Sequence, residues 1–125
     1  MTIPTTKNTK LLRELRELVE PLPGAEEYVM VHHPAFRVGK KPFAVVGLNS
    51  RQEAMLSINL GKMEQAELLA DERFQRTPYI GQHGWVSVLR SQLSDGELWE
   101  LVEDSWRRVA TKRLLKEYES MGAGG

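Results

Sequence analysis

The alternation of apolar and polar residues is clearest in the first half of the chain, over residues 35–46. Phe36 and Val38 alternate with Arg37, glycine, lysine and proline interrupt the run at 39–42, and a second apolar run follows. Successive side chains of a strand point to opposite faces, and a short Gly/Pro linker lets the chain fold back, so this pattern predicts a β-hairpin. We expect four apolar side chains of the hairpin to hold the sheet to its helices: Phe36, Val38, Phe43 and Val45.

Three other segments have the spacing of helices. Leucine and valine recur every three or four positions over residues 11–19, which predicts an amphipathic helix that ends before Pro21. Residues 62–71 predict a short helix with Met63, Ala66, Leu69 and Ala70 on one side. Ser94 and Glu97 have the spacing of a capping box, which predicts the start of a last helix that continues over residues 111–120 after a bend.

Shorter apolar runs predict the remaining strands. Residues 55–60 alternate in polarity, which predicts a third strand. Residues 73–78 are expected to form a linker, and residues 79–82 are expected to form a fourth strand. A tight turn at His83-Gly84 then leads into a fifth strand at 85–90. Residues 25–33 favour strand but are short, so they remain either an edge strand or an extended loop.

The predicted fold class is α+β, a two-layer sandwich in the order helix, three strands, helix, two strands, helix. Hairpin-length connections make the sheet antiparallel. Residues 43–46 and 85–89 are apolar at consecutive positions, so both faces of these strands favour burial, whereas the helices cover one face. We therefore expect the second face to be partly apolar and open to a partner.

Composition places further bounds on the protein. The 125 residues predict one domain over 10–120, with a flexible N-terminus at 1–9 and a flexible Gly-rich tail at 121–125. The net charge is zero, so any electrostatic binding depends on local patches. Cysteine is absent, and the sequence holds neither a signal peptide nor a membrane-length apolar run, so we expect a cytoplasmic protein without a membrane partner.

Residues that carry chemistry are few. His32 and His33 are adjacent in extended chain and point to opposite sides, and His83 lies in a predicted turn, so we expect no metal site. No serine lies in a G-x-S-x-G elbow, and the glycine-rich nucleotide-binding loops are absent. We expect neither an enzyme activity nor a cofactor. Trp99 and Trp106 share one helical stripe, which is more typical of a core than of a subunit contact.

Basic residues are the best lead toward a ligand. Five fall within residues 105–118 against one acid, and others lie in the first hairpin. Such groups can meet the phosphates of DNA, although cations near helix ends and turns are also commonly just solvated. The candidate nucleic-acid-binding residues are Arg37, Lys40, Lys41, Arg107, Arg108, Lys112 and Arg113.

Four segments in order resemble the MmcQ/YjbR family, and the resemblance covers about residues 10–118. They are Leu22-Pro23-Gly24; His33-Pro34-Ala35-Phe36-Arg37-Val38 with Lys41-Pro42-Phe43-Ala44; Pro78-Tyr79-Ile80-Gly81 running into Gly84-Trp85-Val86; and Ser105-Trp106-Arg107-Arg108-Val109-Ala110 with Lys112-Arg113-Leu114. The resemblance implies an α-β(3)-α-β(2)-α arrangement of the CyaY-like superfamily, grouped with secretion-chaperone-like folds. It supplies no catalytic motif, and a likeness of the family to the double-wing domain of a phage transcription factor suggests DNA binding.

Two functions therefore stay open at this point. One is binding of double-stranded DNA through the basic residues named above. The other is a protein-protein interaction or homodimerisation through the partly apolar sheet face.

Overall fold

The computed structural model describes the backbone of residues 6–123 and the side chains of residues 10–122. Its helices and strands follow one another in the order α1 (Thr6–Val19), β1 (Ala25–Met30), β2 (His33–Val38), β3 (Lys41–Leu48), β4 (Ala54–Asn59), α2 (Gly61–Leu68), β5 (Phe74–Arg76), β6 (Trp85–Leu89), α3 (Asp95–Val109) and α4 (Lys112–Ala123). Short 3-10 helices, η1 (Gly81–His83) and η2 (Arg90–Gln92), flank β6. The α+β prediction is confirmed.

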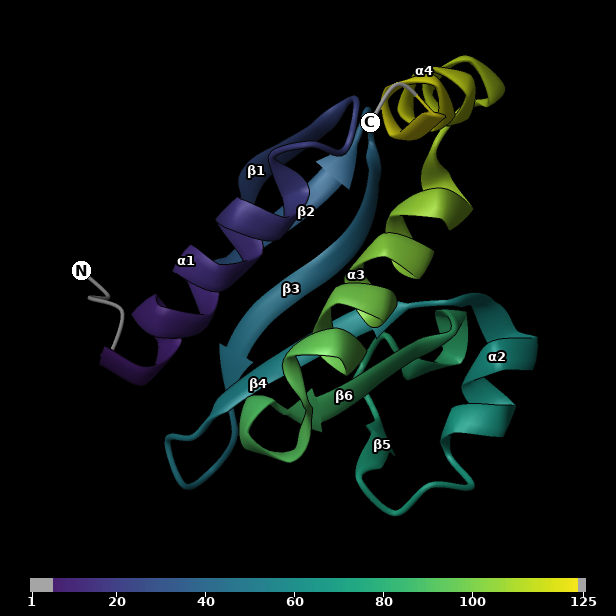
Figure 1. Cartoon of the computed structure of the whole chain (residues 1–125). Coiled ribbons are helices and arrows are strands. Elements are labelled where there is room, and N and C mark those ends of the chain that lie inside the picture. Colours follow the sequence, from purple (N-terminus) through teal and green to yellow (C-terminus); the bar gives the residue numbers. More distant parts are fainter. Residues whose placement is uncertain (1–5, 124–125) are drawn as a thin grey trace.

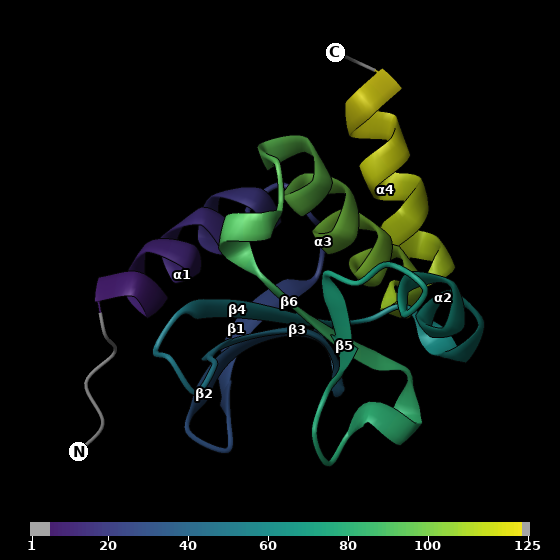
Figure 2. The ribbon, with the colours of Figure 1, turned by 90° about the horizontal axis from the view of Figure 1, so that it is seen from below.

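The sheet has six strands in the order β1-β2-β3-β4-β6-β5, and every neighbouring pair is antiparallel. Helices α1 and α3 lie side by side over one face, α4 lies beyond the end of α3, and α2 lies at the margin beside β6 (Figures 1 and 2). We call the face under α1 and α3 the covered face and the opposite one the open face. The helices thus leave one face of the sheet without a second layer.

The covered face carries the main core. Trp106 is fully buried there, and its indole N–H donates to the Pro23 carbonyl at 3.0 Å. A β-bulge shapes this core, because Phe36 pairs with Ala44 and Arg37 pairs with Pro42, which leaves Phe43 as the extra residue of β3. The bulge lets Phe43 and Ala44 both enter the main core.

The same bulge overturns one prediction about the first hairpin. Phe36, Val38 and Phe43 do pack under the helices as expected. Val45, however, belongs to a separate cluster with Ala35 and Trp85. Alternation counted from Phe43 without the bulge places Val45 on the wrong face. The prediction for Val45 is therefore wrong, and this side chain lies on the open face.

The segment around β5 also differs from the prediction. Phe74–Arg76, expected as part of a linker, pairs with β6, and Phe74 is buried in the main core. Residues 79–82, expected as a strand, form a turn and the start of η1. The last hydrogen bond between the two strands runs from the Thr77 N–H to the Trp85 carbonyl at 3.3 Å. The pairing stops there because the next residue, Pro78, has no N–H to donate. The second hairpin therefore exists, with β5 as its first strand.

Helix α2 buries a different side from the one predicted. Met63 is 84% exposed and Leu69 also faces solvent, whereas Gln65 is the buried residue. Its amide nitrogen donates to the carbonyls of Gly81 at 2.7 Å and Trp85 at 2.9 Å. A polar contact with the segment that leads into β6 therefore fixes the orientation of this helix. The spacing of apolar residues does not reveal such a contact.

Several other predictions are settled by the structure. Residues 25–33 form an edge strand followed by a two-residue turn at Val31-His32, and residues 55–60 contribute β4. The capping box of Ser94 and Glu97 starts α3, and an extended Ala110 separates α3 from α4 at the predicted bend. The flexible ends were predicted over 1–9 and 121–125; residues 6–9 and 121–123 are helical, and residues 1–5 and 124–125 lie outside the described part.

Candidate binding groove on the open sheet face

One row of cross-strand neighbours runs over the open face through all six strands. The pairing registers place these side chains next to one another in the order Tyr28, Ala35, Val45, Ser57, Ser87 and Gln75. The β1–β3 half of the row is apolar or aromatic, and the half on β4, β6 and β5 is polar. The open face therefore has an apolar end and a hydrogen-bonding end.

A groove with a volume of about 940 Å³ lies on this face, and we call it the open-face groove. Val45, Ser57 and Ser87 form part of its floor, Met30 and Val31 contribute from β1 and the β1–β2 turn, and Pro78, Tyr79 and Ile80 contribute from the loop after β5. Both segments project from the sheet on the side away from α1 and α3 (Figure 2). The lining combines apolar side chains with polar ones, and a hollow of this size that offers both is a common form of binding site.

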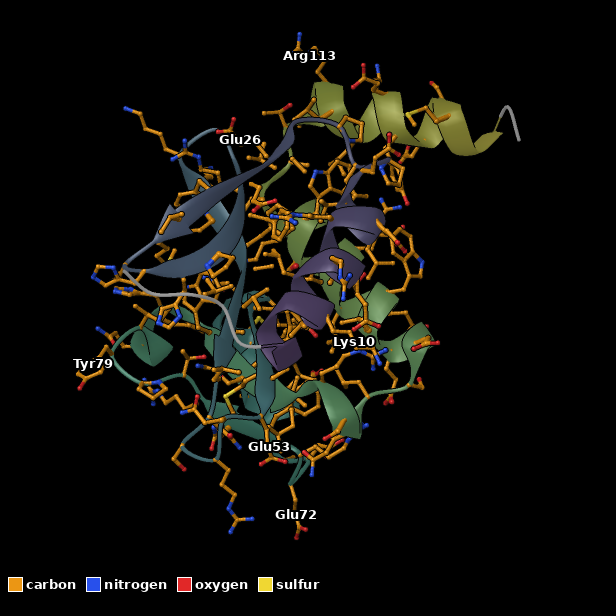
Figure 3. The ribbon with its side chains drawn as sticks, turned by 90° about the vertical axis from the view of Figure 1, so that its left-hand side faces the viewer. Lys10, Glu26, Glu53, Glu72, Tyr79 and Arg113 are labelled. Atoms are coloured by element: carbon orange, nitrogen blue, oxygen red, sulfur yellow. The ribbon has the colours of Figure 1, made fainter. Side chains whose placement is uncertain are left out.

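Two exposed apolar residues, Val31 and Tyr79, stand at the edges of the groove, and we call them the lip residues. Val31 is 78% exposed and Tyr79 is 94% exposed. Figure 3 shows Tyr79 at the margin of the molecule, pointing away from the helices. Both have left-handed backbone, with φ of 45° for Val31 and 67° for Tyr79. Such a φ strains a β-branched or aromatic residue, and strain of this kind gathers at functional sites.

Three hydroxyl groups meet on the groove floor, and we call Ser57, Thr77 and Ser87 the hydroxyl cluster. The Ser87 oxygen lies 2.7 Å from that of Ser57 and 2.9 Å from that of Thr77. Ser87 is buried, whereas Ser57 and Thr77 keep partial exposure. Among the described residues, the side-chain hydrogen bonds of these hydroxyls join them to one another and include no histidine or carboxylate. The cluster can donate and accept hydrogen bonds to a ligand.

The arginines around the groove are compensated, whereas Glu72, which also lines the groove, takes part in none of the ion pairs of the described residues. Arg73 is held by Asp71 at 2.9 Å and Glu97 at 2.9 Å, and these hydrogen bonds raise its pKa. At the other end of the open face, Arg37 pairs with Glu26 at 2.8 Å and lies 4.4 Å from the centre of the Tyr28 ring. Partial burial raises the Tyr28 pKa, so the phenol stays neutral. The arginines therefore offer no unpaired positive charge to a ligand.

The seven predicted basic residues divide into paired and unpaired groups. Arg37 is paired as described above, and Arg107 lies 3.5 Å from Glu103 and 3.9 Å from Glu119, over the ring of Tyr118. The ion pairs of the described residues include none of the other five, which are Lys40, Lys41, Arg108, Lys112 and Arg113.

The fold brings four of these five to one end of the molecule. A Cβ placed on Gly24 would lie 2.7 Å from Leu114 and 3.5 Å from Val38, so the start of α4 adjoins the end of β2. Lys40 and Lys41 follow Val38 after a single glycine, and Lys112 and Arg113 directly precede Leu114. Arg113 lies at the same end as Glu26, the strand partner of Arg37 (Figure 3). Arg108 is separate, beside Gly61 at the start of α2.

The histidines do not converge. His33 lies beside Gly47 and lines the groove, His32 is in the β1–β2 turn, and His83 ends η1. Among the described residues there is no group of three or more histidine, aspartate or glutamate side chains that could hold a metal ion. Within residues 6–123, no helix has the length and apolar character needed to cross a bilayer.

Sequence reasoning missed the lip residues and the hydroxyl cluster. Tyr79 was assigned to a strand, where its side chain would have been half-buried. Ser57 and Ser87 are thirty residues apart, and only the pairing of β4 with β6 brings them together. The available signal is a serine at the middle of each of two largely apolar strands, which indicates one face that is not part of a core.

Taken together, the fold and the groove define a class: a small α+β domain whose antiparallel sheet has one covered face and one open, concave face. The model of the YjbR family matches residues 21–108, more than half of the chain. The chain belongs to the YjbR family. No curated protein matches the sequence. All groove-lining residues lie within the matched segment, whereas Lys112 and Arg113 lie beyond it.

Proposed function

We propose that this protein is a non-enzymatic binding domain that recognises an uncharged, apolar polypeptide segment in the open-face groove. The observation that carries the proposal is the pair of lip residues, Val31 and Tyr79, exposed in strained backbone at the edges of an apolar groove. Left-handed backbone at a non-glycine residue costs about 1–3 kcal/mol, and large apolar side chains gain nothing by facing water. A partner that covers both side chains accounts for their position.

The chemistry of the floor fits a polypeptide. Apolar side chains of a bound segment match the end of the groove formed by Met30, Val45 and Ile80. Backbone N–H and C=O groups need hydrogen-bond partners when they are buried, and the hydroxyl cluster offers both donors and acceptors. An acidic segment would find no unpaired countercharge at Arg73 or Arg37.

A peptide selection tests this proposal. Random peptides displayed on phage are selected against the wild-type protein, immobilised at low density so that copies do not meet. The comparison protein carries Val31→Asn and Tyr79→Asn, because asparagine tolerates left-handed backbone and removes the apolar side chains. We expect apolar, uncharged peptides that bind the wild type at least about tenfold more tightly than the variant. Retention of no peptide, or equal binding to both proteins, would contradict the proposal.

A second candidate function is binding of duplex DNA, which the grouping of Lys40, Lys41, Lys112 and Arg113 at one end favours. Each phosphate that a cation neutralises contributes about −0.9 to the slope of log affinity against log salt. Replacing these four residues with glutamine should weaken binding at low salt and flatten that slope by up to about 3–4. Arg37→Gln with Arg107→Gln is the matched control, because both cations are already paired. Absence of binding at low salt would remove this candidate.

A further inference from the structure

We propose that the occupant of the open-face groove is a second copy of this chain, in a twofold dimer in which Tyr79 of each copy enters the groove of the other. This inference rests on the proposed function, since it names the polypeptide that the groove binds. It adds that the binding site is completed by a residue of the partner copy.

Self-complementarity is the first argument. One face of the molecule carries both a protruding aromatic side chain, Tyr79, and an apolar hollow formed by Met30, Val45 and Ile80. A twofold interface joins the same surface of both subunits, so a protrusion and a hollow on that surface are each used twice. An unrelated partner would fill the hollow and would still need an apolar surface of its own for Tyr79.

The size of the groove is the second argument. Twenty residues line it, from Met30 at the end of β1 to Gln92 in η2. A specific protein-protein interface uses about 20–30 residues on each side, so the groove and its lips alone nearly supply one partner's share. A short peptide would leave much of this lining in water.

Charge supplies the third argument. The chain has a formal net charge of zero, so two copies approach without overall repulsion. The arginines near the groove, Arg37 and Arg73, already have carboxylate partners within the same chain. These arginines therefore add no unpaired positive charge to an interface between two copies.

Sedimentation velocity over a concentration series tests the inference on the full chain. We expect a wild-type dimer at micromolar concentration, and we expect Tyr79→Asn to weaken dimerisation at least about tenfold. Asparagine tolerates the left-handed backbone at this position, so the variant should unfold at the same temperature as the wild type or higher. The matched control is Met63→Gln, which removes another highly exposed apolar side chain, from α2, and should leave the dissociation constant within about twofold.

The outcomes separate this inference from the proposed function. A wild-type monomer at all concentrations, or a dimer that Tyr79→Asn does not weaken, overturns the dimer. If the low-density protein still selects apolar peptides in either case, the groove binds a different polypeptide and the proposed function stands. If neither a Tyr79-dependent dimer nor a selected peptide is found, both are wrong.

Discussion

Val45 and Val46 are neighbours in β3, yet they belong to opposite halves of the molecule. Val46 is fully buried on the covered face, in the core that also contains Ile58 and Trp106. Val45 lies on the open face, in a small cluster with Ala35 and Trp85, and it also lines the groove. The two faces of one strand therefore contribute to different properties of the protein.

The contacts on each face explain this division. The covered face is closed by α1 and α3, so its side chains are packed on all sides. The open face has no second layer and has a groove, with hydroxyl groups on the groove floor and strained turns at the groove edges. We infer that the covered face supplies most of the folding free energy, whereas the open face is available for binding. The predictions below test that division.

The largest effect is expected from Trp106 at the centre of the covered face. Trp106→Ala removes a fully buried aromatic ring and the hydrogen bond to Pro23, and should lower the free energy of unfolding by about 3–5 kcal/mol. Urea unfolding measures this loss. Trp99 lies on the same helix and is only half-buried, so Trp99→Ala should cost clearly less. Equal losses for the two variants would contradict a core centred on Trp106.

A smaller effect compares the two faces directly through adjacent valines. Val46→Ala removes two fully packed methyl groups and should cost about 2 kcal/mol. Val45→Ala should cost about 1 kcal/mol, because its surroundings are open on the groove side. Urea unfolding gives both values. The two substitutions should have the opposite order of effect on dimerisation. Val45→Ala should weaken the dimer, and Val46→Ala should leave its dissociation constant unchanged. A larger stability loss at Val45 would mean that the open face is a second core.

The error at Val45 shows how far the sequence could predict this structure. Local sequence patterns predict helix α1, the first hairpin and the capping box of α3. Each depends on the spacing of residues within one short segment, which the sequence shows directly. Which way Val45 points depends on the bulge at Phe43, and a single extra residue reverses every later side chain of the strand. The apolar run alone does not reveal that residue.

The groove was less predictable than the fold for a related reason. Its lining includes four neighbours of the cross-strand row, from β3, β4, β6 and β5, and these come together only once β4 has paired with β6 across a gap of about thirty residues. A partly apolar second face was expected from the consecutive apolar residues of β3 and β6, and the structure confirms that face. The left-handed turns at Val31 and Tyr79 lack the Asn-Gly pattern that normally signals such turns, so the lips had no local signal.

The smallest effect concerns the outer edge of the covered side, where α4 meets α3. The Tyr118 hydroxyl donates to Glu103, and its ring lies edge-on to Trp106. Burial, together with this hydrogen bond, raises the Tyr118 pKa from an ordinary value near 10 to about 12. The folded state therefore holds the proton more tightly than the unfolded chain. Its contribution to stability is complete below pH 10 and is lost as the pH rises through about 12.

Urea unfolding over this pH range tests whether that edge contributes to the covered face. Wild-type stability should fall more steeply between pH 10 and about 12 than the stability of Tyr118→Phe, which has no proton to lose. Tyr79→Phe is the matched control, because it removes an exposed hydroxyl at the groove and should keep the wild-type slope. If Tyr118→Phe keeps the wild-type slope and Tyr79→Phe loses it, the stabilising tyrosine lies on the open face, and the division of the molecule into a stabilising and a binding face is wrong.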